Sequence, residues 1–83
     1  MRIIIHPHAI ERIKERGIRV KEVMETVGGG DRFRAKFDRV GFRKNFIFRG
    51  AWQGTYYETK QVEVYGVREK GNFIVITAIA RYF

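Results

Sequence analysis

Hydrophobic positions recur with a helical period in the first third of the chain. After a short apolar strand predicted at residues 2–5, Pro7 suits the first turn of a helix, because its missing N–H needs no partner there. A helix is therefore predicted from Pro7 to about residue 16. Its apolar residues share one flank: Ala9, Ile10 and Ile13. Gly17 follows at a position typical of a helix end.

A second helix is predicted at residues 20–27. Its apolar residues follow the spacing i, i+3, i+4, i+7 and form one stripe: Val20, Val23, Met24 and Val27. The charged residues are assigned to the outer face: Lys21, Glu22 and Glu25. Three consecutive glycines at 28–30 end the helix. Val23 and Met24 are therefore expected in the core.

From residue 31 onward the hydrophobic period changes to two, which indicates strands. Apolar Phe33, Ala35 and Phe37 alternate with basic Arg32, Arg34 and Lys36. Further strands are predicted from about residue 40 to 48, at 59–68 and at 73–82. A hairpin turn is expected at 69–72, and the glycine-containing segment 50–57 is interpreted as a loop.

The order of these elements predicts an α+β fold. Two helices would pack on one face of a largely antiparallel sheet, in the order β-α-α-β-β-β-β. The last strand is apolar on both faces, so we expect it in the interior of the sheet. With 83 residues, the chain is long enough for one domain, predicted to span 1–83, and too short for two separate cores.

Composition narrows the setting. The chain has no cysteine, so neither a disulfide framework nor a thiolate metal site is expected. The longest apolar run, Ile3–Ile5, is far too short for a membrane span or a secretory signal. We therefore expect a cytoplasmic, unprocessed protein without a membrane segment, and we propose no metal site or cofactor.

Positive charge points to a polyanionic partner. Seventeen Lys and Arg against nine Asp and Glu give a net charge of +8, and RNA is the partner that this balance favours. Many of the cations lie between residues 31 and 49. The candidate nucleic-acid-binding residues in this segment are Arg32, Arg34, Lys36, Arg43 and Lys44. The alternative is that these side chains simply solvate the outer face of a half-exposed sheet.

Two groups of residues have the chemistry for metal-free RNA cleavage. His8, Arg12, Glu15 and Arg16 follow one side of the first predicted helix, and Arg81 and Tyr82 end the last strand. Candidate catalytic residues are His8, Arg12, Arg16, Arg81 and Tyr82. Alternatively, Arg12 and Glu15 form a surface ion pair, His8 caps or packs the helix, and the C-terminal aromatics close the core.

The first helix also resembles a known family. His8-Ala9, Arg12 and then Glu15-Arg16-Gly17-Ile18 look like the opening H-A-x-x-R-x-x-E-R-G-I of a small family of domains of unknown function. That family is grouped with the RelE/ParE-like toxins, and BrnT is a near relative. His8, Arg12 and Arg16 match the motif, whereas Arg81 and Tyr82 match more loosely the basic and aromatic residues near the C-terminus of such toxins. The middle of the chain, residues 31–57, is nonspecific.

The resemblance implies a RelE-like fold and an mRNA endoribonuclease toxin, acting free or on the ribosome and paired with an acidic antitoxin protein. His8 or Tyr82 would take the proton of the RNA 2′-hydroxyl, while Arg12 and Arg81 would hold the scissile phosphate. Two alternatives fit the same residues. One is a noncatalytic nucleic-acid-binding domain, and the other is a protein-interaction domain whose basic sheet face meets an acidic protein.

Overall fold

The computed structural model describes all 83 residues and contains two helices and one five-stranded sheet. The helices are α1 (Pro7–Glu15) and α2 (Val20–Gly29). The strands are β1 (Ile3–Ile5), β2 (Asp31–Arg34), β3 (Val40–Trp52), β4 (Thr55–Glu69) and β5 (Asn72–Tyr82). Their order in the sheet is β1-β5-β4-β3-β2, with only the β1–β5 pair parallel. The predicted α+β class is confirmed, and so is the interior position of the last strand.

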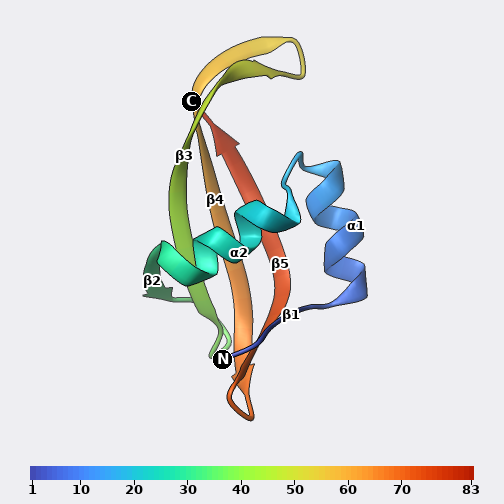
Figure 1. Ribbon diagram of the computed structural model, residues 1–83, viewed down its shortest axis with the longest axis vertical. Coiled ribbons are helices and arrows are strands. Elements are labelled where there is room, and N and C mark those ends of the chain that lie inside the picture. Colours follow the sequence, from blue (N-terminus) through green and yellow to red (C-terminus); the bar gives the residue numbers. More distant parts are fainter.

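Both helices contribute to one core on the same side of the sheet. Helix α2 crosses the sheet face, and α1 lies beside β5 (Figure 1). Strand β1 pairs only with Phe73–Val75, so the rest of that edge of β5 has no strand partner, and α1 packs against β5. Ile13 of α1 and Val23 of α2 are fully buried with apolar residues of the strands. Burial of this shared apolar surface holds the helices on the sheet.

The buried stripe of α2 differs from the predicted one. Val23, Thr26 and Val27 are buried, whereas Met24 is 40% exposed and Val20 is also exposed. Thr26 fits the core because its hydroxyl donates to the carbonyl oxygen of Glu22, 2.7 Å away, and so has a partner inside the helix. The expectation that Met24 is buried was therefore wrong: the helix is rotated so that the other i+3, i+4 set faces the sheet.

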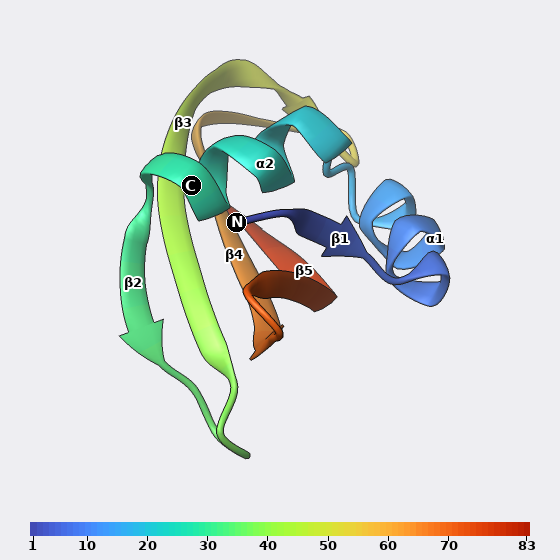
Figure 2. The ribbon, with the colours of Figure 1, turned by 60° about the horizontal axis from the view of Figure 1, so that its bottom comes forward.

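The segment predicted as a loop at 50–57 is a hairpin. Strands β3 and β4 continue to a two-residue turn at Gln53 and Gly54, whose φ angles are +50° and +83°. Two left-handed residues in succession match the right-handed twist of the flanking strands. The register shifts between Ile47 and Gly50, and the hairpin curls back over the end of the sheet (Figure 2). Gly54 thus belongs to a tight turn, and Gly50 to an irregularity within a strand.

Candidate nucleic-acid interface

The β2–β3 hairpin carries arginines that take part in no ion pair. Arg32 and Arg34 alternate along β2 and therefore share one face of the strand. Together with Arg39, they line an open hollow of about 540 Å³, completed by Phe33, Asp38 and Val40. None of the three arginines takes part in an ion pair. Arginines that line an open surface hollow and have no ion-pair partner suit the recognition of phosphate oxygens.

A second hollow lies next to the first and adds aromatic side chains. It measures about 380 Å³ and shares Phe33, Arg34 and Arg39 with the first hollow. Its remaining lining residues are Ala35, Lys36, Phe37 and Tyr65. The Phe33 ring meets the Tyr65 ring edge to face, with 5.7 Å between their centroids. A Cβ atom added to Gly41 would lie 2.3 Å from the Phe33 ring, so only glycine allows the ring to lie this close to β3.

The sheet separates the other two candidate binding residues. Arg43 and Lys44 are neighbours on β3 and therefore point to opposite faces. Arg43 forms an ion pair with Glu63, whose side chain is 1% exposed, and its guanidinium lies 4.6 Å from the centroid of the Phe33 ring. Lys44 lies near α2, where its Nζ would be 3.7 Å from a Cβ atom added to Gly29. The five candidates do not form one patch.

Arg39 also lines the first hollow, although it was not among the candidate binding residues predicted from the sequence. It belongs to the basic segment, but strand alternation alone assigns it no place beside Arg32 and Arg34. The turn that follows β2 brings it back. Phe37 and Asp38 both adopt left-handed φ angles, +60° and +57°, and the backbone N–H of Ala35 donates to the carbonyl oxygen of Arg39 at 2.9 Å. Two consecutive left-handed residues reverse the chain tightly enough to place Arg39 next to β2.

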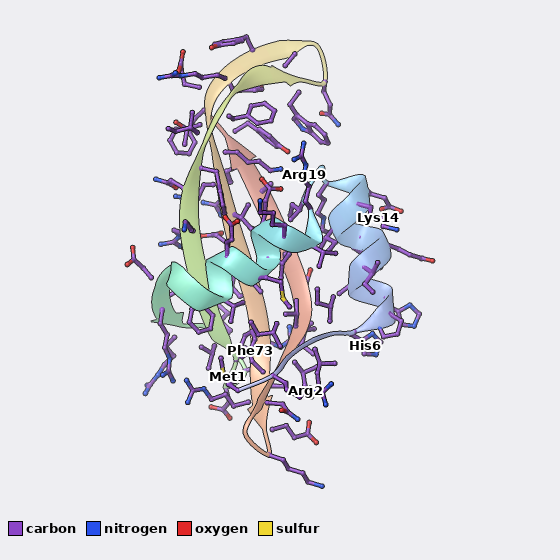
Figure 3. All side chains as sticks on the ribbon, viewed as in Figure 1. Met1, Arg2, His6, Lys14, Arg19 and Phe73 are labelled. Carbon is purple, nitrogen blue, oxygen red and sulfur yellow. The ribbon has the colours of Figure 1, made fainter.

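Two of the candidate catalytic residues share a hollow. His8 and Arg12 are one turn apart on α1 and line a depression of about 210 Å³ with Ile76 and Thr77 of β5. The His8 ring stacks on that of His6, 5.2 Å between centroids, and its backbone N–H donates to His6 Nδ1 at 3.2 Å. His6 is thus the capping residue, at the junction of β1 and α1 (Figure 3). The alternative Arg12–Glu15 ion pair is absent.

Arg16 and Tyr82 are engaged in holding α1 to the sheet. Arg16 Nη1 donates to the carbonyl oxygen of Ala78 at 2.8 Å and to Thr77 Oγ1 at 3.2 Å. The Tyr82 hydroxyl donates to the carbonyl oxygen of Arg16 at 3.2 Å, and its ring stacks on Trp52. Burial raises the pKa of the Tyr82 hydroxyl, and the negative charge of Glu22 raises this pKa further. A phenol that keeps its proton at neutral pH is a poor proton acceptor.

Arg81 lies on the other face of the sheet from Tyr82, because the two are neighbours on β5. Its Nη2 is 3.4 Å from Oε1 of Glu63, the same buried carboxylate that binds Arg43. Two arginines therefore compensate one buried negative charge. Of the five candidate catalytic residues, the structure brings only His8 and Arg12 into one hollow.

No group of three His, Asp or Glu side chains lies close enough together to hold a metal ion. Neither helix is long and apolar enough to cross a membrane. No family model matches the chain, and no curated protein or solved structure matches it. The resemblance to the RelE/ParE-like toxins therefore stays a prediction, carried by the motif of the first helix.

Proposed function

We propose that this protein binds RNA through the β2–β3 hairpin. The observation that carries the proposal is the hollow lined by Arg32, Arg34 and Arg39, three cations without an ion-pair partner. Phosphate contacts supply most of the affinity of nucleic-acid-binding proteins and need cations that are not already neutralised. The net charge of +8 favours approach of a polyanion from any direction. A cytoplasmic location, where RNA is abundant, belongs to the same proposal.

The salt dependence of RNA binding tests this proposal. Affinity for a single-stranded RNA should fall steeply with salt, and each lost phosphate contact should reduce the slope by about 0.7. The double variant Arg32→Gln/Arg34→Gln should therefore bind more weakly and with a flatter slope. Its matched control is Lys14→Gln/Lys21→Gln, which removes the same charge from exposed positions on the helices. Equal slopes for the two double variants would exclude the hairpin as the binding surface.

A second candidate function is RNA cleavage, and the hollow shared by His8 and Arg12 favours it. Metal-free cleavage uses the RNA's own 2′-hydroxyl as nucleophile, so a protein needs to supply positioning, proton transfer and charge stabilisation. His8 would take the hydroxyl proton and Arg12 would hold the scissile phosphate. In that case the protein would act as the endoribonuclease toxin of a toxin–antitoxin pair, on free mRNA or on the ribosome, with an acidic protein as its antitoxin.

A further inference from the structure

Phe37 occupies an unusual position for an aromatic residue. Its side chain is 85% exposed, at the turn between β2 and β3, which projects beyond the neighbouring strands (Figure 2). Its φ angle of +60° lies in the left-handed region, where glycine or asparagine is the favoured residue in such turns. The exposed ring gains little free energy from burial, and the left-handed backbone of a residue with a side chain costs stability. Strain of this kind concentrates at functional positions.

The surroundings of Phe37 combine aromatic faces with positive charge. Phe37 lines the hollow of about 380 Å³ together with Arg34, Lys36 and Arg39, and the Phe33 and Tyr65 rings form another part of its lining. Neither Lys36 nor Arg39 takes part in an ion pair. Aromatic rings next to cations are the arrangement by which proteins hold single-stranded nucleic acids, with bases stacked on the rings and phosphates on the cations.

We propose that Phe37 stacks on an unpaired base of RNA while Arg34 and Arg39 hold the adjacent phosphates. The hairpin then selects single-stranded over double-stranded RNA, because the base faces of a duplex are already stacked on each other. This inference rests on the proposed RNA-binding function and gives it a substrate class. An acidic protein would also meet the cations, but it has no base for the exposed ring to stack on.

Three ligands separate the contribution of the bases from that of the phosphates. These are a short oligouridylate, a ribose-phosphate strand of equal length without bases, and an RNA duplex. The wild-type protein should bind oligouridylate more tightly than either of the other two. Phe37→Ala should weaken oligouridylate binding roughly 5- to 150-fold, the loss expected for one base–aromatic stack. Binding of the strand without bases should be unchanged.

Further variants distinguish stacking from effects on folding. Phe37→Trp keeps an aromatic face and should keep oligouridylate binding. Phe37→Asn suits the left-handed backbone, so it should weaken oligouridylate binding without lowering the unfolding temperature. Tyr56→Ala is the matched control, because it removes another exposed aromatic side chain from the β3–β4 hairpin. It should bind all three ligands like the wild-type protein.

The outcomes separate the two proposals. If Phe37→Ala binds oligouridylate like the wild-type protein while Arg32→Gln/Arg34→Gln binds weakly, stacking is excluded and RNA binding stands. If the wild-type protein binds none of the three ligands, both proposals fail. Polyglutamate bound as tightly as oligouridylate, with no effect of Phe37→Ala on either, would overturn both proposals in favour of an acidic protein partner.

Discussion

Lys60, on the central strand β4, places its Nζ 2.7 Å from Oε1 of Glu22 on α2. The same Nζ donates to the carbonyl oxygen of Gly17, and the rings of Phe48 and Tyr82 lie 5.9 and 5.8 Å from it. Lys60 is only 3% exposed, so its charge is compensated inside the protein. One lysine thus joins the sheet to α2 and to the turn between the helices.

Removal of Lys60 should destabilise the fold strongly. Lys60→Ala leaves the Glu22 carboxylate and the Gly17 carbonyl without this partner, and breaking a buried ion pair costs about 3–5 kcal/mol. Urea unfolding measures this loss. Lys21→Ala is the matched control, because Lys21 pairs with Glu25 at the exposed surface, where a pair contributes about 0.5 kcal/mol. Equal losses for the two variants would contradict the role of Lys60.

Gly17 should not tolerate a side chain. Its φ angle is +74°, and an added Cβ would lie 2.5 Å from Cζ3 of Trp52. Gly17→Ala therefore combines backbone strain with overpacking and should cost more than about 2 kcal/mol. Gly54→Ala carries a similar strain, at φ +83°, with no atom within 4 Å of the added Cβ. Thermal unfolding should show a clearly larger loss of stability for Gly17→Ala than for Gly54→Ala. A smaller loss of stability for Gly17→Ala would mean that Trp52 does not pack against Gly17.

The rotation of α2 can be tested with two adjacent residues. Val23→Ala should cost about 1–3 kcal/mol, because Val23 is fully buried. Met24→Ala should change the free energy of unfolding by less than about 1 kcal/mol, because Met24 remains partly in solvent. The reverse order in urea unfolding would mean that α2 packs through the stripe predicted from its sequence.

The cleavage hypothesis depends on His8 and Arg12. His8→Ala should slow cleavage roughly 10²–10⁴-fold if His8 carries the proton. Arg12→Ala should reduce cleavage far more than binding, because a group that stabilises charge acts mainly in the transition state. Lys14, on the outer side of α1, is the control and should tolerate alanine (Figure 3). RNA left intact by the wild-type protein, alone and with ribosomes, would exclude the cleavage hypothesis and leave RNA binding untouched.

Alkaline pH should destabilise the protein partly through Tyr82. Burial raises the pKa of its hydroxyl in the folded state, so the unfolded chain loses this proton first as the pH rises. The free energy of unfolding should therefore fall once the pH exceeds about 10, the ordinary pKa of tyrosine. Tyr82→Phe should reduce this fall in urea unfolding between about pH 8 and about pH 11. If the free energies of unfolding of Tyr82→Phe and of the wild-type protein changed in parallel with pH, the raised pKa of Tyr82 would be contradicted.

Local features of the chain can be predicted because they depend on neighbouring residues. Pro7 and Gly17 mark the limits of the first helix, as the structure confirms within two residues. The turn predicted at 69–72 is a hairpin turn with Lys70 and Gly71 in left-handed conformation. In each case, residue type restricts the backbone over a few positions, so the local pattern is sufficient.

Predictions from the local pattern were wrong where the same residues are compatible with two conformations. Gly50 and Gly54 are typical of a loop, but one lies at a strand irregularity and the other in a tight turn. The stripe predicted to be buried on α2 included Met24, but the residues that pack against the sheet are those of the neighbouring stripe, which includes Thr26. Only packing against the strands distinguishes these alternatives, because each is compatible with the helix or strand itself.

The amino-acid sequence by itself determined the fold class, the excess of positive charge and the basic segment at residues 31–49. The tertiary structure decided which of those charges remain available. Arg43 and Arg81 compensate Glu63, and Arg16 binds the edge of β5. Arg32, Arg34 and Arg39 keep no such partner. The physical reason is that a charge is neutralised by groups close to it in space. Strand register and chain reversal determine which residues, distant in the sequence, lie next to each side chain.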